Sequence, residues 1–356
     1  SVGKTSTKEA LYAALLRWRR GGVHRSVKSY NNHTGVPLSL ARMPRETEFA
    51  VLELGMNNAG EIAALTRMIR PHVALITAIA PAHIENLGSE EAIADAKGEI
   101  FLGLVREGIA IIPNNTPHRD RLVKAARPHA GQIVTFGSGD ADVHALHAVR
   151  SDGGGSLLTA SLLDSELTFT ISQRGDHWIS NALAVLGAVE AVGGDIAVAG
   201  LALADLGGLK GRGERHRIAI ADGEVLLIDE SYNANPASMA ATLKSLGEEP
   251  SAGRRIAVLG PMRELGAHSD SLHAALAPAV SAAQVDALIL VGEEMNALER
   301  ALDGGVSVHR AQGADDAAAA LLALLRPGDA VLIKASNSVG LAKLVERVKG
   351  SQPCST

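Results

Sequence analysis

The sequence has almost no cysteine and few aromatic residues. Among its 356 residues there is one cysteine, Cys354, and aromatic side chains make up only 3%. A single cysteine excludes a disulfide framework and a cysteine-based zinc site. The apolar content of 46% is enough for real hydrophobic cores, and we expect these to be mainly aliphatic.

Long hydrophobic runs and an excess of positive charge are also missing. No apolar run approaches the roughly 20 residues that cross a bilayer, so we expect no membrane span. The net charge is −5 and no basic stripe stands out, so we expect no nucleic-acid partner. The length favours two or three domains, and the composition is typical of a cytoplasmic α/β protein.

The chain begins with part of a phosphate-binding motif. Gly3, Lys4 and Thr5 match the end of G-x-x-x-x-G-K-[ST], in which backbone N–H groups and the lysine bind phosphates and the hydroxyl holds Mg²⁺. A helix predicted over residues 6–20 would place the phosphates at a helix N-terminus. Because the sequence starts inside the motif, we expect residues 1–356 alone to bind ATP poorly and not to be a competent enzyme.

Strands and helices alternate after this motif. Strands are predicted at 49–54, 73–79 and 109–112, and helices at 58–69 and 90–104. This order predicts a mainly parallel sheet covered by helices, and residues 21–44 are predicted as a loop. Residues 141–172 predict a small antiparallel β subregion, followed by helices at 177–192 and 196–206.

A second α/β unit is predicted beyond a hinge at residues 209–213. Its strands are predicted at 225–228, 255–259, 287–291, 306–309 and 330–333, and its helices at 236–246, 270–283, 293–302, 315–325 and 339–348. This pattern favours a Rossmann-like sheet. No G-x-G-x-x-G follows a strand, which argues against a dinucleotide site. We place the domain boundary between 1–211 and 212–356.

Two polar residues near predicted strand ends are candidate ligands. Glu53 can hold Mg²⁺ opposite Thr5. An ordinary surface acid is the alternative, and the upstream motif favours the functional role. His83 can bind a metal or a phosphate, although a lone histidine is more often a surface or core residue. Its place at the carboxyl edge of a sheet favours function.

Two further segments carry candidate chemistry. Lys97 lies on a predicted helix with Ile93 and Phe101 four residues away, so no helical ion-pair partner is evident and partial burial is indicated. Residues 229–236 connect a strand to a helix and offer hydrogen bonds to ribose and base. The alternative is a polar connection in which Asn235 caps the helix and Pro236 begins it, and both can hold at once.

Taken together, these segments resemble the Mur ligase family. The matching stretches are residues 31–37, 53–62, 82–85, 96–100, 231–236 and 263–266. Their order and spacing match over nearly the whole chain, and the resemblance is greatest to the branch that adds D-alanyl-D-alanine. The family implies a ligase of peptidoglycan precursor synthesis, and so a role in cell wall formation, cell shape and cell division.

The resemblance implies three domains and two reaction steps. The first domain, which binds the UDP end of the substrate, lies outside this sequence. A P-loop ATPase domain at 1–211 precedes a Rossmann-like ligase domain at 212–356 that closes over the nucleotide. A carboxylate of UDP-N-acetylmuramoyl-tripeptide attacks the γ-phosphate of ATP, and the amine of D-alanyl-D-alanine then displaces phosphate from the acyl phosphate. We expect a monomer that uses ATP and Mg²⁺.

The resemblance also implies roles for individual residues. The catalytic residues would be Lys4, His83 and Lys97, and the metal ligands Thr5, Glu53, His83 and, as a carbamate, Lys97. ATP would contact Gly3, Lys4, Thr5, Ser6, Asn181, Arg212, Asp229, Tyr232 and Asn233. Substrate would contact Asn31, Asn32, Thr34, Lys334 and Ser336. Trp178 stands where relatives have asparagine, and its ring could stack on adenine.

Other functions stay open from the sequence. One alternative is a sister Mur ligase or a folylpolyglutamate-type ligase that adds a different amino acid. The Asp-x-x-Arg motif expected late in the diamino-acid-adding sister is not found. A further alternative is a non-catalytic nucleotide-binding protein, against which the intact candidate residues argue. These residues are Lys4, Thr5, Glu53, His83 and Lys97.

Overall fold

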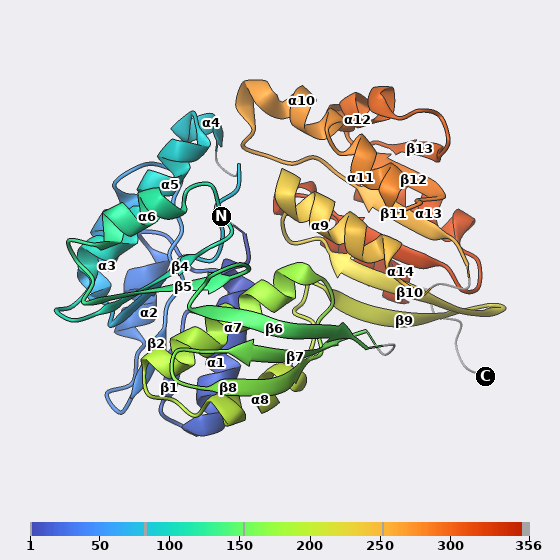
Figure 1. The fold of residues 1–356 in the computed structure, drawn as a ribbon. Coiled ribbons are helices and arrows are strands. Elements are labelled where there is room, and N and C mark those ends of the chain that lie inside the picture. Colours follow the sequence, from blue (N-terminus) through green and yellow to red (C-terminus); the bar gives the residue numbers. More distant parts are fainter. Residues whose placement is uncertain (1, 82–83, 152–153, 251–252, 351–356) are drawn as a thin grey trace. The chain divides into compact units, whose positions relative to one another are not determined.

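The computed structural model describes residues 2–81, 84–151, 154–250 and 253–350, and it forms two compact units (Figure 1). Unit 1 spans Ser1–Gly207 and unit 2 spans Gly208–Thr356. Each unit is a mixed α/β structure whose main sheet contains mostly parallel strand pairs. No helix in the described ranges is long and apolar enough to cross a membrane.

Unit 1 contains two sheets. The smaller one pairs β1 (Val23–Arg25) with β2 (Phe49–Val51) in parallel. The larger one has the order β3-β4-β5-β6-β7-β8. Its strands are β3 (Val73–Leu75), β4 (Ile109–Pro113), β5 (Gln132–Gly137), β6 (Val143–Arg150), β7 (Ser156–Ser161) and β8 (Glu166–Ile171). Pairing is parallel from β3 to β6 and antiparallel from β6 to β8, so the antiparallel region predicted at 141–172 is present.

The helices of unit 1 cover these sheets. They are α1 (Lys4–Trp18), α2 (Gly35–Ala41), α3 (Glu61–Ile69), α4 (Ile84–Leu87), α5 (Glu90–Gly98), the 3₁₀ helix η1 (Glu99–Gly103), α6 (Arg119–Ala126), α7 (Asp176–Ala191) and α8 (Ile196–Ala204). Helix α1 packs against α7 and α8 and contributes Ala10, Ala14 and Leu15 to the core. Trp178 is buried in the same core, so packing against aliphatic side chains accounts for its ring.

The prediction of a loop at residues 21–44 is wrong. The segment contains strand β1, which forms by pairing with β2 far along the chain, and helix α2. The backbone N–H of Gly35 donates to Asn32 Oδ1 at 2.8 Å, which satisfies a free donor at the start of α2. The helix predicted at 90–104 is also interrupted, because it continues after Gly98 as the 3₁₀ helix η1.

Unit 2 is built on one sheet of order β13-β12-β11-β14-β10-β9. Its strands are β9 (Glu214–Ile220), β10 (Gly223–Glu230), β11 (Arg255–Leu259), β12 (Ala287–Val291), β13 (Ser307–Ala311) and β14 (Ala330–Lys334). All neighbours pair in parallel except β9 and β10, which form an antiparallel hairpin. Every residue of β12 and β14 is buried, as expected for parallel strands covered on both faces.

Helices follow the strands of unit 2. They are α9 (Pro236–Gly247), η2 (Gly266–His268), α10 (Ser269–Ala274), α11 (Ala277–Ala282), η3 (Glu293–Met295), α12 (Asn296–Ala301), α13 (Ala314–Leu324), η4 (Asn337–Val339) and α14 (Ala342–Gly350). The helix predicted at 270–283 is two helices, α10 and α11, and Pro278 lies in the first turn of α11. Proline suits that position because its missing N–H would have no helical partner there.

The strand order creates a switch point beside β14. The chain runs from β10 past β14 to β11, β12 and β13, and then returns to β14. Helix α9 packs against α11, and α13 packs against α14. Because parallel crossovers are right-handed, these two helix pairs cover opposite faces of the sheet. The loops after β14 and its neighbours therefore diverge at the carboxyl edge, where ligands of open α/β sheets bind.

The buried side chain of Asp329 is expected to contribute to the stability of unit 2. This buried carboxylate accepts hydrogen bonds from Arg254 Nη2 at 2.8 Å and from the backbone N–H groups of Arg254 and Arg326. Asp329→Ala removes the buried ion pair with Arg254 and leaves the two backbone donors unpaired, and we expect a loss of about 3 kcal/mol in unfolding free energy. Urea unfolding followed by circular dichroism measures the loss.

The control for Asp329 is the exposed ion pair between Asp315 and Arg347. Asp315→Ala should leave the unfolding curve unchanged, because water replaces an exposed partner. Both tryptophans, Trp18 and Trp178, lie in unit 1, so their fluorescence should report a separate transition that Asp329→Ala does not shift. Equal curves for the two variants would contradict the role of Asp329.

Candidate functional site

The first turn of α1 requires a glycine at its start. Gly3 is the N-cap and has φ 82°, in the left-handed region that glycine adopts without strain. A Cβ at this position would lie 2.9 Å from Asn181 Oδ1. Asn181 of α7, predicted as a nucleotide contact, therefore lies directly beside the predicted phosphate-binding residues, with Lys4, Thr5 and Ser6 in the same helical turn.

Glu53 is a buried carboxylate that connects several segments. Its Oε2 accepts a hydrogen bond from Thr5 Oγ1 at 2.9 Å, and its Oε1 accepts one from Asn31 Nδ2 at 2.8 Å. Its own backbone N–H donates to Ser26 Oγ at 3.0 Å. The structure thus brings Thr5 and Glu53 together, as expected from the place of Glu53 near the end of a predicted strand, and adds Asn31 to the same carboxylate.

Lys8 is a functional candidate that sequence reasoning missed. Its buried Nζ donates to Ser26 O at 3.1 Å and to Lys28 O, and it lies 3.0 Å from Glu9 Oε1 and 3.9 Å from Glu53 Oε2. The available signal was its spacing, because four residues after Lys4 is one helical turn on the same face. Lys8 places a second positive charge next to the Glu53 carboxylate.

Lys97 on α5 is buried close to Lys4. Burial, and secondarily the positive charge of Lys4, lower the pKa of Lys97 to about 7. A large share of Lys97 is therefore the neutral amine near neutral pH, in contrast to an ordinary lysine. The neutral amine is the form that can react with carbon dioxide to give a carbamate.

The donor set fits a hard divalent cation. Thr5 offers a hydroxyl and Glu53 a carboxylate, and oxygen ligands of this kind suit Mg²⁺. His83, predicted to bind the second metal, lies outside the described residues. Among the predicted substrate residues, Asn31 lies at the Glu53 carboxylate, whereas Asn32 and Thr34 are exposed and Asn32 Oδ1 accepts from backbone N–H groups at the start of α2.

A second group of predicted residues lies in unit 2, around Asp229. Its buried carboxylate accepts from the backbone N–H of Gly211 at 3.1 Å and of Ser231 at 3.0 Å. The Arg212 guanidinium lies over the Tyr232 ring, 4.3 Å from its centroid. The segment before β9 is thus joined to the loop after β10, and Asp229 shapes that loop through its backbone.

Lys334 ends the central strand β14 and is fully buried. Its Nζ donates to Asn233 O at 2.9 Å and to Glu230 Oε2 at 3.3 Å. Burial lowers the pKa of Lys334 despite the neighbouring Glu230 carboxylate. Ser336, two residues later, accepts from the backbone N–H of Arg263 at 2.9 Å. The sequence did not predict that Glu230 pairs with Lys334, because only the pairing of β10 with β14 brings the two residues together.

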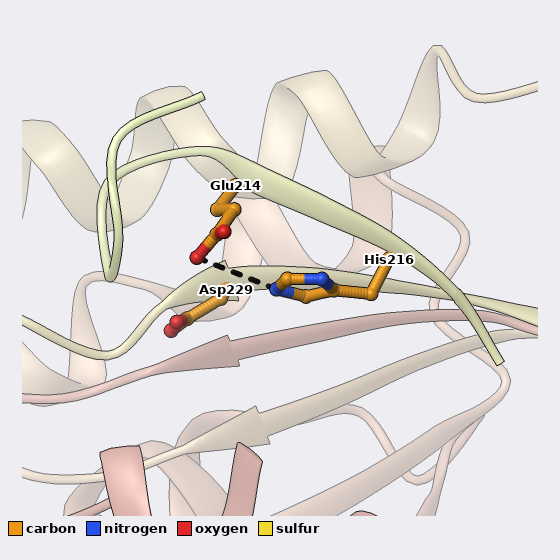
Figure 2. Close-up of side chains that lie close together, drawn as sticks. All are labelled: Glu214, His216 and Asp229. Atoms are coloured by element: carbon orange, nitrogen blue, oxygen red, sulfur yellow. Dashed lines mark ion pairs between the residues drawn. The ribbon is translucent and has the colours of Figure 1, made fainter. Parts of the chain in front are cut away.

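Figure 2 shows a mixed cluster on the β9–β10 hairpin. Glu214, His216 and Asp229 each offer a potential metal-ligand atom, and these atoms lie within 4.8 Å of one another. Glu214 and His216 form an ion pair at 3.4 Å, and both Asp229 oxygens already accept backbone N–H groups. Because backbone donors already occupy both oxygens of Asp229, we assign no metal to this cluster.

Comparison with known proteins identifies the family. The family model described as the Mur ligase middle domain matches residues 1–189, and the model described as the Mur ligase, glutamate ligase domain matches residues 211–337. This chain belongs to the Mur ligase family.

Relatives that share one name cover the whole chain or nearly all of it. The UDP-N-acetylmuramoyl-tripeptide–D-alanyl-D-alanine ligase of Synechocystis sp. is 35% identical over 100% of this chain and 74% of its own length. The Escherichia coli K12 protein of the same name is 34% identical over 99% of this chain and 76% of its own length.

Solved structures with similar folds carry a related name. MurF from Acinetobacter baumannii has a TM-score of 0.88 and 29% identity, and the match covers 99% of this chain and 75% of that one. MurF ligase from Thermotoga maritima, solved in complex with ADP, has a TM-score of 0.84 and 26% identity, covering 98% and 78%.

The buried Lys97 amine predicts an unusual pH dependence of stability. Between about pH 7 and its ordinary pKa of 10.5, the unfolded state binds more protons at this lysine than the folded state, so folding stability rises with pH. Lys97→Met removes the burial penalty. We expect it to stabilise unit 1 by up to about 4 kcal/mol at about pH 7, with a gain that shrinks towards pH 10.

Urea unfolding followed by tryptophan fluorescence, in buffer free of metal and bicarbonate, measures this gain. Lys8→Met is the matched control, because the Lys8 amine is hydrogen-bonded to Ser26 and Lys28. Its removal should destabilise unit 1 at every pH. A Lys97→Met protein less stable than the wild type at about pH 7 would contradict the burial argument.

Proposed function

We propose that this chain carries the nucleotide-binding and ligation machinery of an ATP-dependent ligase that joins D-alanyl-D-alanine to UDP-N-acetylmuramoyl-tripeptide. The observation that carries the proposal is the cluster at the start of α1. There Thr5 donates a hydrogen bond to Glu53, and Lys97 lies close to Lys4. The Asn181 side chain lies directly beside Gly3. The names of relatives 31–35% identical to the chain support the choice of substrates.

Under this proposal, unit 1 is a P-loop ATPase domain and unit 2 a Rossmann-like ligase domain. ATP contacts the first turn of α1, including Ser6, and Asn181 in unit 1. In unit 2, the nucleotide-binding residues that the family resemblance implies are Arg212 and those of the loop after β10. The muramoyl peptide contacts the 31–34 segment, and the edge formed by Lys334 and Ser336 binds substrate.

Thr5 and Glu53 would supply oxygen ligands to one Mg²⁺. His83 and a carbamylated Lys97 would bind a second ion. Mg²⁺, when bound, neutralises charge on the phosphoryl oxygens. Lys4 stabilises the charge that develops on the transferring group. Asn31 and Lys8 keep the Glu53 carboxylate in place through the contacts described above.

The reaction has two steps. In the first, a peptide carboxylate oxygen attacks the γ-phosphorus of ATP and the bond from this phosphorus to the bridging oxygen breaks. The products are ADP and an acyl phosphate. The dipeptide amine then attacks the acyl carbon, loses a proton, and expels inorganic phosphate to give the amide. The protein acts as a monomer in the cytoplasm, where ATP is supplied.

Acceptor-dependent phosphate release tests the function. The complete gene product, supplied with UDP-N-acetylmuramoyl-tripeptide, ATP and Mg²⁺, should release phosphate when D-alanyl-D-alanine is added. Lys4→Met should lower kcat at least about 100-fold, because the developing phosphoryl charge loses its fixed cation. Lys124→Met, at an exposed position on α6, is the matched control and should keep the wild-type rate.

The choice of acceptor separates the alternatives. Stimulation by a single amino acid but not by the dipeptide would point to a sister ligase instead. No stimulation by any acceptor would favour a nucleotide-binding protein without ligase activity.

The carbamate on Lys97 has its own signature. Protein equilibrated with ¹³C-bicarbonate should show a carbamate resonance that Lys97→Arg lacks, because a guanidinium stays protonated. Lys97→Ala should lose activity and regain part of it with a small carboxylate such as formate. A wild-type spectrum without the resonance, together with activity that is unchanged when carbon dioxide is removed, would overturn the assignment.

A further inference from the structure

The loop at residues 260–265 is held by hydrogen bonds on two sides. It follows β11 at the carboxyl edge of the second sheet, beside β14. The backbone N–H of Gly260 donates to Lys334 O at 2.9 Å, and that of Ser336 donates to Pro261 O at 3.1 Å. Arg263 N–H donates to Ser336 Oγ at 2.9 Å. These bonds join the loop to the segment that follows Lys334.

A buried histidine holds the same loop from the other side. His273 on α10 is fully buried, and its Nε2 accepts the backbone N–H of Met262 at 2.9 Å. Its Nδ1 lies 2.8 Å from the carbonyl oxygen of Ser269, to which it must donate. The two contacts require a neutral ring with its proton on Nδ1, because a protonated Nε2 could not accept from Met262.

The tip of the loop is exposed and conformationally unusual. Met262 and Leu265 are buried, whereas Arg263 and Glu264 between them are exposed. Glu264 has φ 64°, a left-handed conformation that is strained for a residue other than glycine. Such a conformation persists only where the surrounding structure determines it, and Ser336 and His273 hold the two residues just before it, Arg263 and Met262.

The groups around His273 shift its pKa in opposite directions. Burial lowers the pKa of His273, and the Arg263 guanidinium acts in the same direction. The carboxylates of Glu294 on η3 and Asp270 on α10 act in the opposite direction. Each carboxylate is paired, Glu294 with Arg263 and Asp270 with Arg300 of α12 at 3.8 Å. Acidification would protonate Nε2 and remove the acceptor for Met262.

We propose that His273 is a positioning residue for the amine acceptor, since it holds the 260–265 loop, through Met262, in the shape that the acceptor site requires. This role rests on the ligase function proposed above. The loop lies at the switch point beside β14, where Lys334 and Ser336 are the predicted substrate residues. A change in the shape of the loop should therefore weaken binding of the acceptor more than binding of ATP.

Two substitutions separate the two ring contacts. In His273→Gln the side-chain amide oxygen can take the place of Nε2 and still accept from Met262. In His273→Asn the shorter amide can take the place of Nδ1 and donate to Ser269, but the contact with Met262 is lost. The exposed His268, at the end of η2, provides the control His268→Asn, which should keep the wild-type kinetics.

The assay is acceptor-stimulated phosphate release by the complete gene product, with thermal unfolding as a check on folding. His273→Asn should lower kcat/KM for D-alanyl-D-alanine about tenfold, mainly through KM, and leave KM for ATP unchanged. His273→Gln should recover most of the loss. Wild-type activity should decline below the ordinary histidine pKa of 6.5, and His273→Gln should lack this decline.

Hydrogen exchange at the Met262 amide reads the contact independently of activity, and it should be fast in His273→Asn and slow in His273→Gln. An active wild type with equal kinetics and equal pH profiles in the two variants would overturn the positioning role alone. A wild type with no acceptor-stimulated phosphate release would overturn the ligase function, and the positioning role with it.

Discussion

A buried carboxylate is the constraint on which the arrangement of the first unit depends. Glu53 cannot remain charged inside the protein without donors, because an unpaired buried charge costs several kcal/mol. The partners of its carboxylate are Thr5 and Lys8 in α1 and Asn31 after β1, and the Glu53 backbone N–H donates to Ser26 Oγ in the same segment. Satisfying one side chain therefore fixes the first turn of α1 relative to the segment between β1 and α2.

Apolar runs made much of the fold predictable. Strands β11 and β12 have the bounds that the sequence predicts, because each contains a continuous apolar run between a charged residue and a glycine. Strand β1 was missed because it has three residues and depends on β2 for its hydrogen bonds. Strand β9 was missed because its sequence, Glu214–Ile220, begins with charged residues that suit the antiparallel edge of a sheet.

The candidate site was predictable where a motif encodes it. The Gly3–Thr5 motif indicated Thr5 and Glu53, and apolar neighbours indicated the burial of Lys97. The contacts Lys8–Ser26, Glu230–Lys334 and His273–Met262 each join a helix or strand to a different segment of the fold, so local sequence patterns did not predict them. Side-chain exposure was equally hidden, as the exposed Asn32 and Thr34 illustrate.

The central place of β14 in the second sheet has a consequence for synthesis of the chain. This strand is the last to be made, yet it lies between β10 and β11, which precede it by about a hundred and about seventy residues. Until Ala330–Lys334 leaves the ribosome, β10 and β11 have an open gap between them, with unpaired backbone groups on both sides. Unit 1 can fold during translation, whereas the loops around Lys334 must assemble afterwards. A chain that ends before β14 would expose two unpaired strand edges, which are prone to aggregation.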